Sequence, residues 1–306
     1  MPSAWDGLKN CREITELPHY AVNKTLPADS YFTSPETAQR CWEAIKSVVP
    51  VDECHFLEPS AGAGAFYDLL PSDRRVALDL YHTRDDFEHA DFLQWWPKSD
   101  APSWCVVGNP PFGVRGATAL AFVNRAFLFA DWVAFILPMS FHSNGKGSNM
   151  KRVKGAHLVF SETWEGERFY SPDSNKQIKV NTLFQIWKRG EGESIFPDLD
   201  VSDWVDVYTV CSSPNRLCGM DKLDLYDFYV SSSYYGDELH TVYTFDEVKY
   251  GSGYGCVIKQ NREEIMDWTR TVNWNDWGSL ATNSAKHVRK YSIEQALYSK
   301  GWGRRK

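Results

Sequence analysis

One short stretch of the chain has residue types that suit chemistry at the end of a buried strand: VVGNPPFG, residues 106–113. The apolar residues 104–107 predict a strand of a covered sheet. Proline has no amide hydrogen to donate, so strand pairing must stop at Asn109, and the two prolines then stiffen the backbone. The stretch is therefore either a rigid exit turn or a fixed cradle that presents the Asn109 amide and Phe112 to a ligand.

Two earlier strand ends also carry residues suited to a ligand. EPSAGAG, residues 58–64, follows a predicted strand and supplies small residues where a ligand could approach the backbone, before a helix predicted from Ala65. Asp79 ends the next strand about twenty residues on, where an acid typically holds ribose hydroxyls. A solvated acid is the simpler interpretation of Asp79.

The pair Asp91 and Phe92 lies between these strand ends and NPPF. A carboxylate next to an aromatic ring suits the amino group and the ring face of a nucleobase. The alternative is an acid at a strand edge beside a core phenylalanine. The order and spacing of these segments, rather than any one of them, indicate a ligand site.

The elements that would position these residues alternate through about residue 190. Strands are predicted at 54–57, 75–78, 104–107, 132–137, 156–160 and 180–187, with helices at 37–49, from 65 and at 117–129. This alternation predicts an α/β fold with a Rossmann-like, doubly wound, mostly parallel sheet, whose ligands bind beyond the carboxyl ends of the strands. The predicted domains are 1–190 and a smaller C-terminal α+β region, 191–306.

Composition narrows the class of protein. The seven cysteines of this 306-residue chain are scattered and lack a CxxC pair, so we expect reduced thiols and no metal site. No apolar run reaches about 18 residues, so we expect no membrane partner and a cytoplasmic protein. The net charge is −7, yet residues 144–189 carry nine basic and four acidic side chains. A basic segment is usually a solvated face, but beside a catalytic cleft it could instead contact phosphates.

The motif order resembles the class I S-adenosylmethionine-dependent methyltransferases that modify adenine amino groups. FTSPE, residues 32–36, precedes EPSAGAG, and ADFLQW precedes GNPPFG, as in the gamma arrangement of TaqI-type DNA adenine methyltransferases of restriction-modification systems and of related phage and prophage enzymes. The resemblance covers about residues 30–190. NPPF is shared with RNA adenine methyltransferases and, as NPPY, with protein-glutamine methyltransferases.

The resemblance implies S-adenosylmethionine as cofactor and assigns its contacts residue by residue. At the methionine end of the cofactor the resemblance implies Phe32, Thr33 and Pro35, and along the methionine and ribose it implies Glu58, Ser60, Gly62 and Gly64. It implies Asp79 at the ribose hydroxyls, and Asp91 and Phe92 at the adenine of the cofactor. Asn109 would border the cofactor as well. Thr33 could instead cap the following helix, with Glu36 completing a capping box.

The resemblance also implies the catalytic residues Asn109, Pro110, Pro111 and Phe112. The Asn109 side-chain oxygen and the Pro110 carbonyl would accept hydrogen bonds from the adenine amino group, which a rigid turn preorganises. Phe112 would stack on a flipped-out base, and Phe184 or Trp187 would close its other face.

The expected partner is nucleic acid, with DNA favoured over RNA. In the basic segment 142–152, predicted to be a loop, Lys146, Lys151 and Arg152 would contact phosphates, and 191–306 would recognise the target. An RNA adenine methyltransferase is the main alternative. A protein-glutamine methyltransferase and a non-catalytic binding subunit are less favoured.

Overall fold

The computed structural model of the chain describes residues 31–81, 83–98, 101–142, 144–145, 147–170, 177–235, 239–280 and 285–306. The described residues form two compact units. Unit 1 falls within 1–141 and 147–195, and unit 2 within 142–146 and 196–306. The division lies five residues after the predicted boundary, and a short segment from the first half of the chain joins unit 2.

Unit 1 is built on an eight-stranded sheet in the order β1-β7-β8-β6-β5-β2-β3-β4. Its strands are β1 (Phe32–Thr33), β2 (His55–Glu58), β3 (Arg75–Asp79), β4 (Glu88–His89), β5 (Trp104–Gly108), β6 (Trp132–Pro138), β7 (Ala156–Tyr170) and β8 (Gln177–Arg189). The pairs from β6 to β4 are parallel, whereas β8, β7 and β1 are added antiparallel. The predicted doubly wound, mostly parallel sheet is confirmed.

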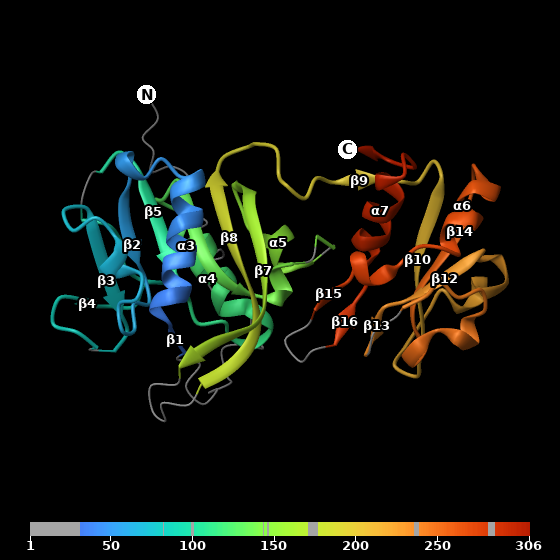
Figure 1. Cartoon of the computed structure of the whole chain (residues 1–306), viewed down its shortest axis with the longest axis horizontal. Coiled ribbons are helices and arrows are strands. Elements are labelled where there is room, and N and C mark those ends of the chain that lie inside the picture. Colours follow the sequence, from blue (N-terminus) through green and yellow to red (C-terminus); the bar gives the residue numbers. More distant parts are fainter. Residues whose placement is uncertain are drawn as a thin grey trace. The chain divides into compact units, whose positions relative to one another are not determined.

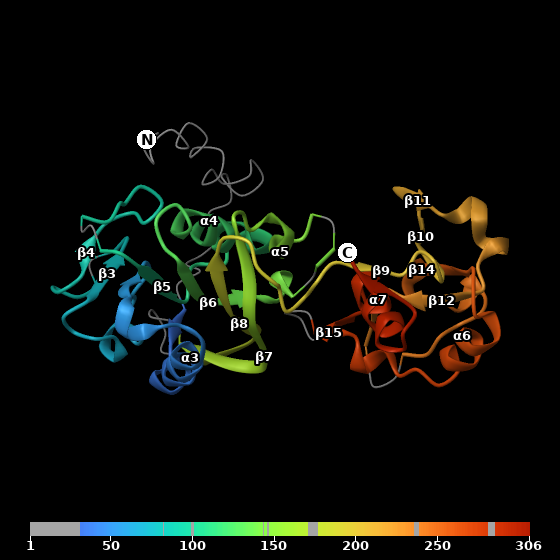
Figure 2. The same cartoon turned by 90° about the horizontal axis from the view of Figure 1, so that it is seen from above.

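Helices cover both faces of this sheet. Figure 2 shows α3 (Pro35–Val48) on one face and α4 (Ala117–Ala126) with α5 (Asn149–Arg152) on the other. Short 3-10 helices lie at Val51–Glu53, Tyr67–Leu69, Val114–Gly116 and Met139–Phe141. Because β2, β3 and β5 run parallel, their carboxyl ends meet at one edge, which brings together the segments singled out in the sequence (Figure 1).

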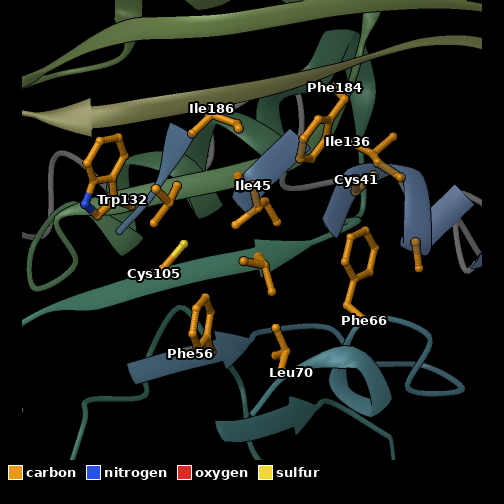
Figure 3. Packing of buried hydrophobic residues seen from close by; sticks show 14 of the residues in the cluster. Cys41, Ile45, Phe56, Phe66, Leu70, Cys105, Trp132, Ile136, Phe184 and Ile186 are labelled. Carbon is orange, nitrogen blue, oxygen red and sulfur yellow. The ribbon is translucent and has the colours of Figure 1, made fainter. Parts of the chain in front are cut away.

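The core beneath that edge is packed from α3 onto the sheet. Cys41 and Ile45 of α3 are fully buried and form one cluster with Phe56, Ile136 and Phe184 from the strands (Figure 3). Fully burying one such aliphatic or aromatic side chain contributes about 1.5–3 kcal/mol. The strand ends are therefore anchored by a rigid layer, as a preorganised site requires.

Two predicted elements of unit 1 differ from the structure. The helix predicted from Ala65 is replaced by turns and the 3-10 helix Tyr67–Leu69, because Pro71 leaves too few residues for an α-helix. The loop predicted over 142–152 contains α5, which Ser148 caps by accepting a hydrogen bond from the Lys151 amide at 3.3 Å. In both segments the sequence pattern predicted a different type of element from the one that the structure has.

The described residues of unit 2 form three small sheets and two α-helices. The sheets are β11-β10-β14-β12, β13-β16-β15 and β17-β9. Their strands are β9 (Leu199–Asp200), β10 (Val205–Ser213), β11 (Arg216–Cys218), β12 (Phe228–Ser231), β13 (Ser233–Tyr234), β14 (Ser252–Ile258), β15 (Ser279–Leu280), β16 (Lys286–His287) and β17 (Arg304–Arg305). The α-helices are α6 (Arg262–Thr269) and α7 (Lys290–Ser299), with 3-10 helices at Met220–Leu225, Phe245–Glu247, Lys249–Gly251 and Trp274–Asp276. Unit 2 has its own core around the fully buried Trp274, Tyr234 and Phe228.

Across the described residues, none of the helices combines the length and the apolar character needed to span a membrane.

Candidate functional site

Two hollows adjoin each other at the carboxyl ends of β2 and β5 and have Asn109 in common. The first, here called the aromatic hollow, has a volume of about 390 Å³ including open solvent and is lined by Tyr31, Asn109, Pro110, Phe112, Phe169 and Val180. The second, the turn hollow, has about 260 Å³ and is lined by Tyr31, Phe32, Thr33, Glu58, Ser60, Ala61, Gly62, Ala63, Ala65 and Asn109. The strand-end motifs of the sequence thus form one site with two compartments.

Asn109 stands between the two hollows with an unused acceptor. Its Nδ2 donates to the Tyr31 carbonyl at 3.4 Å, and the Ser60 hydroxyl donates to the Asn109 carbonyl at 3.3 Å. Its Oδ1 is buried and has no hydrogen-bond partner among the described residues. An unsatisfied buried acceptor costs about 1–3 kcal/mol, so a ligand that donates a hydrogen there would recover this energy.

The prolines and Phe112 shape the floor of the aromatic hollow. Pro110 is buried and Phe112 is half-buried, and both line the hollow. Phe112 also packs against the α3 core, which holds its ring in place. Pro111 lines neither hollow, so it contributes backbone rigidity rather than contact. The arrangement presents a polar acceptor beside an aromatic face, which suits a flat heterocycle with an amino group.

The glycine turn is shaped by Gly62 and Asp79. Gly62 has φ +53°, and a Cβ there would lie 2.8 Å from the Phe32 ring, so only glycine fits beneath that ring. The buried Asp79 carboxylate accepts from the Gly62 amide at 2.7 Å and from the Tyr81 amide at 2.9 Å. Asp79 therefore holds the turn in shape, although it lines neither hollow itself.

Glu58 provides a carboxyl that lines the turn hollow. It is 2% exposed, and its Oε2 accepts from the Tyr67 amide at 2.7 Å. Burial raises the pKa of Glu58 well above its usual range, against the lowering effect of the Tyr67 amide. The raised pKa favours the neutral carboxyl, which can donate as well as accept a hydrogen bond.

The FTSPE segment divides between the hollow and the helix. Phe32 and Thr33 line the turn hollow. Ser34, not Thr33, caps α3, because its hydroxyl oxygen accepts from the Thr37 amide at 3.1 Å. Pro35 is the exposed first residue of α3 and lines neither hollow, so its predicted cofactor contact lacks geometric support.

Three other predicted cofactor residues line neither hollow. A Cβ on Gly64 would meet Arg84 and Phe87, which places this glycine against those side chains. Phe92 is 2% exposed, with its ring centroid 5.0 Å from that of Phe122, so the prediction that it offers a ring face is wrong and the core interpretation holds. Asp91 is exposed, and its Oδ1 accepts from the Leu93 amide at 2.9 Å.

The predicted stacking role of Phe184 and Trp187 is wrong because both rings are core residues. Phe184 is fully buried and lies among the core side chains drawn in Figure 3. Its ring stacks on Trp164 with a centroid distance of 5.7 Å. Trp187 is 3% exposed and donates its Nε1 hydrogen to Gln185 at 3.1 Å.

Phe169 of β7 and Val180 of β8 line the aromatic hollow instead. The period-2 alternation of β8 carries the signal that was missed. It puts Val180 on the same face as Phe184 but nearer the hairpin end. Phe169 lies on β7 opposite Ile178, so the hairpin brings both side chains to the same end of the sheet.

The basic residues predicted to meet phosphates are on the exposed face of α5. Lys151 and Arg152 are exposed. The helix itself is anchored, because buried Asn149 donates to the Arg115 carbonyl at 2.9 Å and to the Ser140 hydroxyl at 2.8 Å. Lys146 lies outside the described residues. Within the described part of the chain, no three His, Cys, Asp or Glu side chains gather in a way that could hold a metal ion.

No family model and no curated protein matches the sequence. Solved structures with some likeness include PH1948 from Pyrococcus horikoshii, described as a candidate RNA methyltransferase, at 15% identity and a TM-score of 0.41, covering 60% of this chain and 99% of that one. Another is ChlM, the magnesium protoporphyrin IX methyltransferase from Synechocystis PCC 6803 with bound SAM, at 10% identity and a TM-score of 0.36, covering 51% of this chain and 79% of that one. A third is the 23S rRNA methyltransferase ErmE, at 16% identity and a TM-score of 0.36, covering 55% of this chain and 73% of that one. At these values the likenesses carry no functional argument, and the site itself must supply it.

Proposed function

We propose that the chain is an S-adenosylmethionine-dependent methyltransferase that modifies the exocyclic N6 amino group of adenine in DNA. One observation carries the proposal: the buried, unpartnered Oδ1 of Asn109 lies where the aromatic hollow and the turn hollow adjoin. An amino group is the donor that such an oxygen requires. The aromatic hollow then holds the base, and the turn hollow holds the cofactor.

The residues of the turn hollow fit the cofactor in chemical type. S-adenosylmethionine supplies, when bound, a methyl group activated by a positively charged sulfur. Gly62 lets the Phe32 ring lie directly against the turn, where any Cβ would displace it, and Asp79 offers next to this turn a carboxylate suited to ribose hydroxyls. Phe32, Thr33 and Glu58 line the hollow itself.

Asn109 prepares the acceptor nitrogen. The adenine amino group is a weak nucleophile, because its lone pair is delocalised into the ring. Hydrogen bonds to the Asn109 Oδ1 and to the Pro110 carbonyl favour a pyramidal nitrogen whose lone pair is directed toward the turn hollow. The Ser60 hydroxyl holds the Asn109 backbone, and the prolines prevent it from relaxing, so the stabilisation is preorganised.

The aromatic hollow selects a flat acceptor. Phe112 offers a ring face, and Phe169 and Val180 from the β7–β8 hairpin add apolar surface. In duplex DNA the adenine must leave the stack to enter, which costs a few kcal/mol. The resemblance in motif order to TaqI-type enzymes favours DNA, and exposed Lys151 and Arg152 offer charge for its phosphates.

Labelled-methyl transfer tests the proposal. The full chain is incubated with radiolabelled S-adenosylmethionine and, in parallel, with adenine-containing duplex DNA, single-stranded DNA, RNA, and duplex DNA whose adenines are replaced by 2-aminopurine. We expect label in DNA, recovered as N6-methyladenine after digestion, and none in the 2-aminopurine duplex, which lacks the 6-amino group. Label found in RNA and not in DNA would mean that the substrate is RNA instead of DNA. Bound cofactor without transfer to any polymer would contradict it.

A further inference from the structure

Cys211 and Cys218 face each other across the β10–β11 hairpin of unit 2. They are direct partners in the antiparallel register, followed by Ser212 with Leu217 and Ser213 with Arg216. Opposed residues in such a pair have Cα atoms about 4.5–5.5 Å apart and side chains on the same face. A disulfide needs Cα atoms about 4.4–6.8 Å apart, so the strands already have the required spacing.

We propose that Cys211 and Cys218 form a redox-sensitive thiol pair that closes to a cross-strand disulfide. Both are free thiols in the structure, and Cys218 is partly exposed whereas Cys211 is buried. No other strand pairing among the described residues sets two cysteines opposite each other. The remaining described cysteines, Cys41, Cys54, Cys105 and Cys256, are buried.

The difference in exposure gives the order of the reaction. With a small disulfide such as oxidised glutathione as oxidant, the Cys218 thiolate attacks one of its sulfur atoms and releases the first glutathione as a thiol. Cys211 then attacks the Cys218 sulfur and releases the second. The protein loses two protons and two electrons and gains one S–S bond, and the oxidant is reduced to two glutathione thiols.

The disulfide would pin a segment that is otherwise held weakly. β11 has three residues and, among the strands that the structure describes, pairs only with β10, whereas β10 also pairs with β14 over seven residues. The 3-10 helix Met220–Leu225 follows β11 directly and displays Leu225 at 65% exposure. Closing the hairpin therefore restrains the edge strand and the segment that leaves it.

Peptide mapping tests the proposal on the full chain. The protein is equilibrated with graded ratios of oxidised to reduced glutathione, quenched in acid, alkylated and cut with trypsin without reduction. Arg216 lies between the two cysteines, so trypsin places Cys211 in peptide 190–216 and Cys218 in peptide 217–222. We expect these two peptides to be joined in oxidising buffer and to separate on reduction.

Two variants separate the outcomes. Cys218→Ser, at a partly exposed position, should leave Cys211 as a free thiol, because Cys211 has lost its partner and its burial keeps it from glutathione. The control Cys54→Ser, in unit 1, should leave the joined peptides unchanged. A wild-type protein that stops at a glutathione adduct on Cys218, or that links either cysteine elsewhere, would overturn the proposal.

Discussion

Replacing Gly62 by alanine should separate cofactor binding from folding, and Gly155 provides the matched control. Both glycines have left-handed φ angles, +53° and +65°, so alanine costs about 1–2 kcal/mol of backbone energy at either position. A Cβ at Gly155 meets nothing within 4 Å. A Cβ at Gly62 would lie 2.8 and 2.9 Å from two carbons of the Phe32 ring, which must therefore move.

Because Phe32 lines the turn hollow, its displacement changes the shape of the proposed cofactor site. We expect Gly62→Ala to raise the Kd for S-adenosylmethionine at least tenfold, which corresponds to about 1.4 kcal/mol. Gly155→Ala should lower the melting temperature similarly but leave the Kd within about twofold, as the same φ cost acts outside the hollow. Isothermal titration and thermal denaturation measure the two effects. Equal Kd values for both variants would refute the placement of the cofactor in the turn hollow beside Phe32.

Three further predictions address the carboxyls and the basic helix. Asp79→Ala should weaken S-adenosylmethionine binding by about 1.5–3 kcal/mol in a titration, because a charged acceptor is lost, whereas exposed Asp73→Ala should not. Lys151→Ala with Arg152→Ala should flatten the salt dependence of duplex DNA affinity by about two units, since each phosphate contact contributes about −0.9 to the slope. Burial raises the pKa of Glu58, so its stabilising contribution is present at low pH and is lost as the pH rises through the folded pKa. Glu58→Gln should therefore gain stability over the wild type as the pH is raised above 4.5, the ordinary pKa of a glutamate.

Each of these has a clear contrary result. An unchanged Kd in Asp79→Ala would leave Asp79 as a residue that only shapes the turn. If the Lys151→Ala, Arg152→Ala variant has the same salt dependence of duplex affinity as the wild type, α5 does not belong to the nucleic-acid surface. The same conclusion follows if the control Lys46→Ala on α3 flattens the salt dependence equally. A stability difference between Glu58→Gln and the wild type that does not vary with pH would mean that Glu58 does not titrate in this range.

Sequence patterns predicted the sheet and the strand-end motifs well, because both depend on local signals. A buried strand is a short apolar run, and a proline pair or a glycine turn after it marks where pairing stops. The structure accordingly brings Glu58, Gly62 and Asn109 to one edge. Asp79 also lies there, holding the Gly62 amide.

Other features depend on packing between distant segments, which local patterns do not encode. Phe184 and Phe92 are aromatic residues in segments that resemble the family's motifs, yet both rings are buried in the hydrophobic core. Phe169 reaches the aromatic hollow because β7 runs to residue 170, ten residues beyond the predicted strand end. The facing of Cys211 and Cys218 follows from hairpin register, which the spacing of the cysteines alone does not give.

The most direct test of the account is the methyl-transfer rate of Asn109→Ala on duplex DNA at saturating S-adenosylmethionine. Removing one preorganised polar group should lower the rate about 100- to 1000-fold while the Kd for the cofactor stays close to that of the wild type. Gln39→Ala, which removes an exposed amide from α3, is the matched control and should retain the full rate. Turnover by Asn109→Ala at the wild-type rate would contradict the claim that the unpartnered Oδ1 of Asn109 binds the reacting amino group.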